Sequence, residues 1–374
     1  MPSAGPGQLP DRLRRPARYV LPNYSIPYLS RVLWQRHPYN GHSGIVAAWW
    51  IQRVFFVAAG VAAGGLMTLA AAVAFSSPQQ LSPASARAPA PPDFPLAWVP
   101  TLNIVTARDG APLAYRLYPG QEGRIVVLIH GSTGTSYDVH DEAETLRRAG
   151  ATVYSLDLRG HGGSGTRNGD VSYVGQLDDD LKDFLQATGL QGPGTHLTLA
   201  GFSVGGGFAL RIASGPNRDL FDSYLALTPF IPRDTALSPS SGNAWVAIAK
   251  PRILALRTLE WLGLPWFQDL VVARYARPCQ PDARCSPAYT YRMRMSLHVD
   301  GTWPEAAARI NRPTTIVALP DDEVSPAHPR ARKMATANPQ VVIMAVDGVQ
   351  HFALVQDARG QKVVTDAWRA IAGD

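Results

Sequence analysis

The clearest chemical signal in the sequence is Ser203, at the centre of the motif Gly-Phe-Ser-Val-Gly. An apolar run at residues 196–200 predicts a buried strand before the motif, and residues 208–213 predict a helix after it. A strand, a Gly-x-Ser-x-Gly turn and a helix are typical of a tight turn that exposes a serine hydroxyl above the end of a sheet. The glycines leave room for neighbouring backbone. We therefore interpret Ser203 as a nucleophile.

A serine hydroxyl needs a partner base, because it is a poor nucleophile at neutral pH. His351 follows the last strand-like run, and an imidazole can take the hydroxyl proton and later return it to a leaving group. The alternative is a histidine that only satisfies hydrogen bonds in the core. A carboxylate must in turn hold the imidazole. The candidates for this acid are Asp321, Asp322 and Asp347.

From Thr101 onward, strand-like and helix-like segments alternate, which predicts an α/β domain. The run at residues 125–129 is entirely apolar, as expected of a strand that is buried on both faces. The other predicted strands span residues 102–106, 113–118, 152–157, 224–228, 314–319 and 341–346, and the other predicted helices span residues 139–149, 174–188, 329–336 and 361–371.

Four segments, in chain order, resemble those of the α/β-hydrolases. They are His-Gly-Ser-Thr-Gly at residues 130–134, Asp-Leu-Arg-Gly-His-Gly-Gly-Ser at residues 157–164, the Ser203 turn, and Asp321-Asp322 followed by His351. The likeness covers most of residues 101–374 and is similar to the branch of monoacylglycerol lipases, lysophospholipases and aminopeptidase-like serine hydrolases. It implies an α/β fold with a mostly parallel central sheet, helices on both faces and an inserted, mainly helical cap.

The resemblance also implies roles for individual residues. The acid is Asp322, because the family places it directly after the strand at residues 314–319. The backbone N–H groups of Ser132 and Val204 are the implied donors to the oxyanion. Three further polar residues of these segments are interpreted as loop scaffolding: His130, Arg159 and His161.

The stretch from Pro229 to Arg312 interrupts the alternation and is too long for a simple connection. In a fold of this kind, an insertion there, at about residues 230–312, is a cap over the serine. Residues 244–264 predict a helical segment broken at Lys250-Pro251. Its aromatic residues either pack the cap onto the core or favour an acyl or aromatic substrate: Trp245, Trp261, Trp266 and Phe267. The cap is mildly basic, and Arg292 and Arg294 either suit an anionic head group or membrane surface or are solvated.

Two further groups of residues could bind a metal in principle, but we expect another role for each. Cys279 and Cys285 are the only cysteines, and in an oxidising compartment they are expected to form a disulfide rather than a metal site. Asp178, Asp179 and Asp180 predict a solvated helix face, because no His or Cys pattern accompanies them. We expect neither a metal nor an organic cofactor, since phosphate-binding and dinucleotide-binding glycine motifs are absent from the sequence.

The first 53 residues contain seven arginines and one aspartate, so they carry the entire net charge of +6. The rest of the chain is neutral, which argues against a nucleic-acid partner. The uncharged run at residues 54–75 is long enough to span a bilayer. We interpret the chain as a basic segment at residues 1–44, a transmembrane signal anchor at 45–75, a Pro/Ala/Ser-rich linker at 76–100 and an α/β-hydrolase domain at 101–374.

The charge asymmetry also predicts an orientation. Basic residues precede the apolar run and almost none follow it, so the N-terminus is expected in the cytoplasm and the catalytic domain in the periplasm or outside the cell. A cleaved signal peptide is the main alternative, since Ala-Val-Ala at residues 72–74 resembles a cleavage site.

The expected function is a membrane-anchored serine hydrolase that cleaves a carboxylic ester, such as an acylglycerol or lysophospholipid, through an acyl-enzyme. The alternatives are a serine aminopeptidase or amidase, and a non-catalytic binding module that keeps the fold. Dehalogenases and epoxide hydrolases of this fold are disfavoured because they place an aspartate where this chain has Ser203. The sequence leaves the oligomeric state open.

Overall fold

The structure is a computed structural model that describes residues 42–81, 98–231, 245–276, 286–299, 302–325 and 327–373, with only the backbone described for residues 42–48. The chain divides into two compact units, Met1–Ala62 and Ala63–Asp374, which we describe separately. The predicted disulfide between Cys279 and Cys285 lies outside the described residues.

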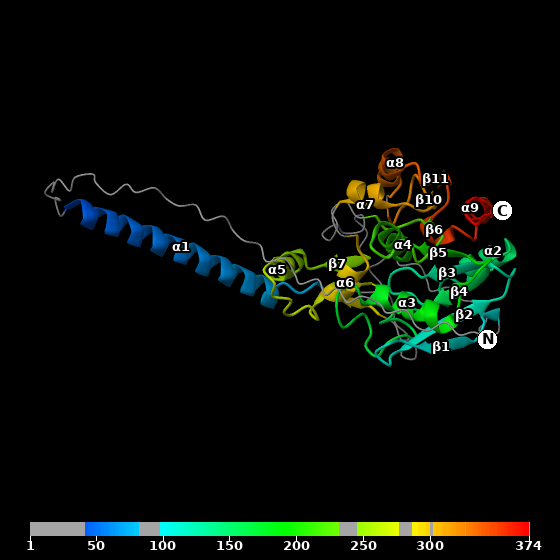
Figure 1. Cartoon of the computed structure of the whole chain (residues 1–374), viewed down its shortest axis with the longest axis horizontal. Helices are drawn as coiled ribbons and strands as arrows, with labels where there is room; N and C mark the ends of the chain where they lie inside the picture. Colours follow the sequence, from blue (N-terminus) through cyan, green and yellow to red (C-terminus); the bar gives the residue numbers. More distant parts are fainter. Residues whose placement is uncertain are drawn as a thin grey trace, which may run out of the picture. The chain divides into compact units, whose positions relative to one another are not determined.

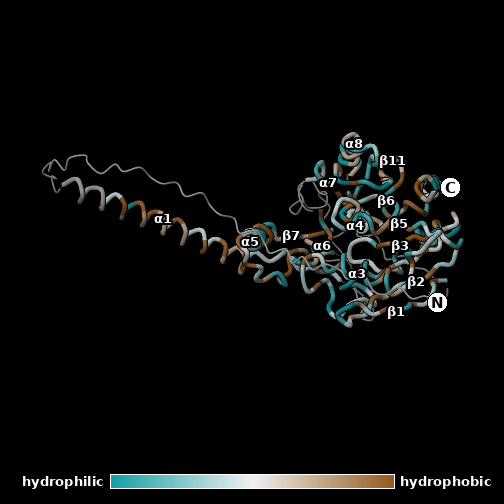
Figure 2. Tube along the Cα trace, viewed as in Figure 1, coloured by the Kyte–Doolittle hydropathy of each residue, from teal (hydrophilic) through white to brown (hydrophobic). Residues whose placement is uncertain are grey.

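Helix α1 (His42–Phe75) provides all the described structure of the first unit and continues into the second. Within the described part of the chain it is the one helix that is long and apolar enough to cross a membrane, over Trp49–Phe75, where the mean hydropathy is 2.0. Apolar residues recur along this stretch (Figure 2). Its length and composition agree with the predicted anchor.

The second unit is built on an eight-stranded sheet (Figure 1). The first two pairings, between β1 and β2 and between β2 and β4, are antiparallel, and all later pairings are parallel. In spatial order the strands are β1 (Leu102–Thr106), β2 (Pro112–Tyr118), β4 (Thr152–Leu156), β3 (Arg124–Ile129), β5 (His196–Phe202), β6 (Ser223–Leu227), β10 (Thr314–Ala318) and β11 (Val341–Ala345).

Successive side chains of the central strands point to opposite faces of the sheet. Each face therefore has its own hydrophobic cluster, and helices pack on both faces. In β3, Val126 and Leu128 belong to one hydrophobic cluster, whereas Val127 and Ile129 belong to the other. The first cluster includes α2 (His140–Arg148) and α9 (Ala358–Arg369). The second cluster includes α3 (Gln176–Thr188), α4 (Val204–Ser214), α7 (Trp303–Arg309) and α8 (His328–Ala337).

We call the segment between β6 and β10 the insertion. It contains the helices α5 (Lys250–Trp261), α6 (Tyr291–Ser296) and α7, as expected of a mainly helical cap. It also contains an antiparallel three-stranded sheet that the sequence pattern did not predict. The strands of this sheet, in order, are β7 (Val246–Ile248), β8 (Val271–Tyr275) and β9 (Ala288–Thr290).

Two expectations for the insertion are wrong. The first is the helix predicted to start at residue 244, because β7 occupies its beginning and α5 starts only at Lys250, where Pro251 fits the first turn. The second concerns the aromatic residues. Trp245 is partly buried against the core, whereas the other three are largely exposed and do not line the pocket of Ser203: Trp261, Trp266 and Phe267.

Candidate active site

Ser203 lies in the sharp turn between β5 and α4. Its backbone has φ 54° and ψ −115°, a conformation that a residue with a side chain rarely adopts. The turn is held by the Ser203 N–H, which donates to the Leu227 carbonyl across 2.9 Å, and by the Ser203 carbonyl, which accepts from the N–H groups of Gly207 and Phe230. The surrounding hydrogen bonds therefore hold the strained residue in place.

Glycines surround the turn because nothing larger fits. A Cβ atom at Gly201 would overlap the backbone of Gly205, and a Cβ atom at Gly205 would overlap the carbonyls of Ile129 and His130. The strand, the turn and the helix are therefore packed backbone against backbone.

The structure brings the three predicted side chains together, although 148 positions separate two of them. His351 Nε2 lies 3.0 Å from Ser203 Oγ, and His351 Nδ1 lies 2.9 Å from Asp322 Oδ2. The imidazole is completely buried and packs against Phe202, at a ring-centroid distance of 5.1 Å, and Phe352, at 4.9 Å. Because a carboxylate only accepts hydrogen bonds, this geometry favours the tautomer with the proton on Nδ1, which leaves Nε2 to accept from the serine.

Three neighbouring acidic residues, Asp321, Asp322 and Glu323, have different environments near His351. Asp322 Oδ1 accepts from the N–H groups of Val324 and Ser325 at 2.8 and 2.6 Å, which fixes the carboxylate toward the imidazole. Asp321 is exposed. Glu323, which sequence reasoning missed, accepts the backbone N–H of His351 at 3.0 and 3.1 Å. No pattern in the sequence points to that contact, because it depends on how two loops meet.

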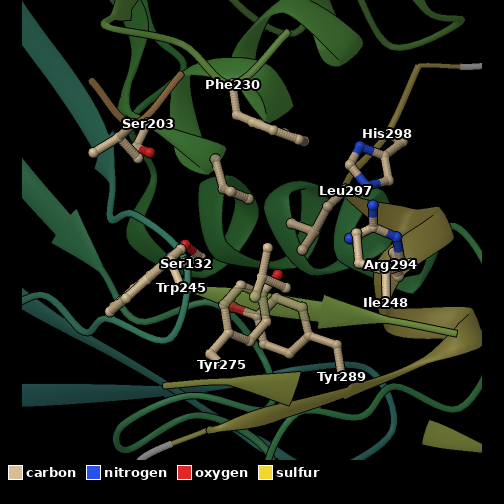
Figure 3. Close-up of a pocket in the computed structure, with 13 residues that line it drawn as sticks. Ser132, Ser203, Phe230, Trp245, Ile248, Tyr275, Tyr289, Arg294, Leu297 and His298 are labelled. Atoms are coloured by element: carbon tan, nitrogen blue, oxygen red, sulfur yellow. The ribbon is translucent and has the colours of Figure 1, made fainter. Parts of the chain in front are cut away.

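The two predicted oxyanion donors belong to residues that line the pocket of Ser203. Val204 is the first residue of α4, where backbone N–H groups have no partner within the helix, and Ser132 follows β3. Both residues line the same pocket as Ser203 (Figure 3). His130 orders this loop: its Nε2 accepts from the Leu158 N–H at 3.1 Å, so Nδ1 carries the proton and donates to the Gly131 carbonyl at 2.7 Å.

A tyrosine of the insertion, Tyr289, also contacts this loop and was not predicted. The Thr133 N–H donates to the Tyr289 phenol oxygen at 2.7 Å, and the phenol lies 2.7 Å from His161 Nε2. His161 Nδ1 lies 3.3 Å from the Arg159 carbonyl, so the phenol donates in turn to Nε2. Thr133 has a left-handed φ of 59°, which this hydrogen bond helps to hold.

Arg159 is buried in an ion pair, which corrects the prediction of a solvated aspartate run. Its guanidinium donates to Asp180 at 2.8 and 2.6 Å and to Asp109 at 2.8 Å. Burial raises the pKa of Asp180, and the bonds from Arg159 oppose that effect. Asp178 is also buried and pairs with Arg211. Asp178 and Asp180 of α3 are buried because each carboxylate forms an ion pair with an arginine.

The pocket beside Ser203 is lined mostly by apolar side chains, with polar side chains at two sides. Figure 3 shows Ser203 and Ser132 on one side, with Arg294 and His298 on the other. Apolar side chains form most of the remaining wall: Phe230, Trp245, Val246, Ile248, Leu297 and Val324. Within the described ranges, no group of three His, Cys, Asp or Glu residues is arranged to hold a metal ion.

Comparison with known proteins agrees with this architecture. The chain is 26% identical over 266 residues to the non-heme chloroperoxidase CPO-A1 of Kitasatospora aureofaciens, a match to 67% of this chain and 92% of that protein. It is 31% identical over 83 residues to a monoacylglycerol lipase of Mycolicibacterium smegmatis, covering 22% of this chain and 30% of that lipase.

Among solved structures, the monoacylglycerol lipase of Paleococcus ferrophilus is similar with a TM-score of 0.50 and 19% identity, over 70% of this chain and 98% of that chain. Residues 120–354 match the family described as serine aminopeptidase, S33. The predicted α/β-hydrolase fold is therefore confirmed, and the chain belongs to the S33 serine aminopeptidase family of the α/β-hydrolases.

Proposed function

We propose that this protein is a membrane-anchored serine hydrolase that cleaves carboxylic esters, of lipid or acylglycerol type, through an acyl-enzyme. The observation that carries the proposal is the hydrogen-bonded series from Asp322 through His351 to Ser203, with distances of 2.9 and 3.0 Å, at the edge of a largely apolar pocket. Each member has the partner that its chemistry requires.

The proposed reaction has two halves. In the first, Ser203 Oγ attacks the ester carbonyl carbon while His351 Nε2 takes its proton, and the N–H groups of Ser132 and Val204 donate to the oxyanion. The C–O bond to the alcohol then breaks, and the imidazolium protonates the leaving alcohol. In the second half a water molecule attacks the acyl-enzyme, its proton passes to His351, and the acid leaves as Ser203 regains its proton.

The charges in the pocket favour an ester over an aminopeptidase substrate. A free amine is a cation and needs a carboxylate partner in the site. The described residues that line the pocket include no aspartate or glutamate, and they include Arg294, which repels a cation. The apolar walls suit an acyl chain. A non-catalytic role, the other alternative, leaves unexplained why a strained serine is kept in contact with an ordered imidazole.

The membrane part of the proposal is supported by α1 and by the arginines before it. We propose a single-pass protein of the inner membrane, with residues 1–44 in the cytoplasm, an uncleaved anchor at 45–75, a linker at 76–100 and the hydrolase domain, with a cap at about 230–312, in the periplasm or outside the cell. The guanidinium of Arg53 lies 3.5 Å from the ring centroid of Trp49, a pairing suited to a membrane interface.

The catalytic proposal is tested by labelling the full-length protein, in detergent, with a fluorophosphonate probe. We expect the wild-type protein to be labelled and to hydrolyse p-nitrophenyl esters in preference to aminoacyl anilides. Ser203→Ala should abolish labelling and lower kcat by at least about 10⁴-fold. Ser172→Ala, at an exposed serine outside the pocket, is the matched control. Persistent labelling of Ser203→Ala would refute the proposed nucleophile.

The orientation is tested separately. A reporter enzyme that is active only in the periplasm, fused after residue 100, should be active, and the same reporter fused after residue 44 should be inactive. The reverse pattern contradicts the proposed topology, and a shortened mature protein starting after residue 74 contradicts the uncleaved anchor.

A further inference from the structure

The last turns of α1 pack against the insertion. They belong to the same compact unit as the hydrolase domain. Val73 is buried in a small hydrophobic cluster with Ile253 and Leu256 of α5, and Leu69 packs against this cluster. The candidate membrane helix therefore ends in a packed contact with α5.

A buried arginine of α5 adds a polar contact to this packing. Arg252 is only 6% exposed. Its Nη1 donates to the Val271 carbonyl at 2.9 Å, and its Nη2 lies 3.5 Å from the Ala74 carbonyl, near the end of α1. The last carbonyl groups of a helix have no partner within the helix and bear a partial negative charge, which a guanidinium complements. Apolar packing and charge thus both hold α5 against the end of α1.

Large apolar side chains are exposed on α5 and on the loop that follows it. Leu254 and Trp261 are seven positions apart, so they lie on one side of α5, a different side from the buried Ile253 and Leu256. An exposed apolar patch on a folded protein usually marks a surface that binds something. The residues that we call the α5 surface are 51% to 84% exposed: Leu254, Trp261, Leu262, Trp266 and Phe267.

The backbone of Phe267 gives a second indication. It has a left-handed φ of 61°, which costs energy for a residue with a bulky side chain. The side chain is 55% exposed, so packing within the described part of the chain offsets little of this cost. A strained aromatic residue at the surface is therefore better explained by a contact outside the protein.

The proposed anchor determines where α5 lies relative to a bilayer. The apolar stretch Trp49–Phe75 has 27 residues. About 20 residues of helix cross the hydrocarbon core, so the turns from about Leu69 onward reach the polar interface beyond it. Because α5 packs against Leu69 and Val73, it lies at this interface.

We propose that the α5 surface inserts into the headgroup region of the bilayer that α1 spans, so that the hydrolase domain has a membrane contact of its own beside the anchor. Tryptophan and phenylalanine suit this region, since their rings are apolar enough to leave water there. Ile248 of β7 packs on the cluster beneath α5 and also lines the pocket of Ser203, so the same contact holds the pocket close to the bilayer. The inference rests on the proposed anchor and is independent of the proposed ester chemistry.

The charges of this segment indicate which kind of lipid is needed. Arg257 and Asp269 are both exposed and of opposite sign. Glu260 accepts from the Tyr291 phenol at 2.6 Å and from the Gln268 amide at 3.2 Å, so its carboxylate is engaged within the insertion. Burial of apolar area, rather than attraction to anionic lipid, is therefore expected to bind the α5 surface, and zwitterionic phosphatidylcholine should suffice.

The experiment measures tryptophan fluorescence of the full-length protein in phosphatidylcholine nanodiscs, with and without bromine atoms on the acyl chains as quenchers. The difference between wild type and a single Trp→Phe variant gives the contribution of that residue. The variants are Trp261→Phe and Trp266→Phe on the α5 surface, Trp50→Phe in α1 and, as the matched control, Trp98→Phe. Trp98 is 69% exposed and precedes β1, which lies away from α5 in Figure 1.

We expect brominated lipid to remove at least about half of the fluorescence of Trp261 and of Trp266, because an interfacial segment buries its apolar side by about 5–10 Å. The contribution of Trp98 should be unchanged. Quenching of Trp261 and Trp266 no stronger than that of Trp98 overturns the inference. Protection of Trp261 from the aqueous quencher acrylamide without quenching by lipid overturns it as well, since a second copy or another protein then covers the surface.

Trp50 separates this inference from the proposed anchor. Quenching of Trp50 without quenching of Trp261 and Trp266 rejects the α5 surface alone and leaves the anchor in place. The opposite pattern supports the membrane contact of the insertion and rejects the anchor. If lipid quenches none of these residues, both the anchor and the α5 surface are rejected.

Discussion

The phenol oxygen of Tyr289, on the insertion, lies 2.7 Å from the backbone nitrogen of Thr133, on the loop that contains Ser132. The phenol is fixed from its other side by His161, also at 2.7 Å. The insertion therefore not only lines the pocket of Ser203 but also contributes to the position of a proposed oxyanion donor.

The Tyr289→Phe variant tests this contact. Losing the hydroxyl leaves the Thr133 N–H without its phenol acceptor, so the loop loses part of its order while the pocket keeps its apolar wall. We expect kcat to fall by about 10- to 100-fold, less than for a deleted oxyanion donor, with little change in KM. Tyr224→Phe is a matched control, because its buried phenol donates to the Arg218 carbonyl at 2.9 Å. An equal loss of kcat in both variants argues for general destabilisation instead.

The adjacent residues Asp321 and Asp322 give a second prediction, because only one of them contacts His351. Asp322→Asn should lower kcat by about 10³- to 10⁴-fold, because an amide in place of the carboxylate no longer favours the imidazole tautomer that accepts from Ser203. Asp321→Asn, at the exposed neighbour, should change kcat by less than about 3-fold. Steady-state hydrolysis of a p-nitrophenyl ester measures both. If Asp321→Asn is the more damaging change, our choice of acid is wrong.

The buried ion pair of Asp180 and Arg159 predicts a loss of stability rather than of chemistry. Asp180→Asn should lower the free energy of unfolding by about 3 kcal/mol, since it removes one partner and leaves a buried guanidinium with less compensation. Asp179→Asn, one position earlier, breaks a pairing with the largely exposed Arg108 and should cost less than about 1 kcal/mol. Denaturant unfolding of the purified protein compares the two, and similar losses contradict the assigned difference.

Glu142 on α2 predicts a pH dependence of stability. Burial raises its pKa to about 8, so the folded protein holds a proton that the unfolded chain releases near pH 4.5. Stability should therefore fall as the pH rises from about 4.5 to about 8, by at most about 5 kcal/mol, and this cost should be absent below that range.

The variant Glu142→Gln removes the titration and should raise Tm at pH 8 while leaving it nearly unchanged at pH 4. Glu144→Gln, two residues later, is the control with the opposite sign: Arg147 lowers the pKa of Glu144, so this carboxylate contributes stability at neutral pH that is lost on acidification. A Glu142→Gln protein with the wild-type dependence of Tm on pH disproves the assignment.

The central sheet could be predicted from the sequence because its strands are short apolar runs between turn residues. Residues 125–129, for example, form all but the first position of β3. The sheet of the insertion could not be predicted in this way. Its strands β7 and β9 have three residues each, which is too few for an alternating pattern to be recognised.

The contacts of Ser203, His351 and Asp322 could be anticipated because motif and chain order locate all three. Glu323 and Tyr289 could not be found, since each acts on a backbone N–H of a segment distant in sequence. The aspartates of α3 show the same difficulty: their burial depends on arginines elsewhere in the chain, and composition alone favoured solvent exposure.

The glycines around Ser203 restrict how this enzyme could acquire new chemistry. Because Gly201 and Gly205 have backbone atoms where any side chain would begin, the shape of the turn tolerates no gradual remodelling. A change of reaction has to come from exchanging the single side chain at position 203, for example to cysteine, or from the walls of the pocket. Laboratory evolution of this protein should accordingly accumulate substitutions in the insertion and leave the turn untouched.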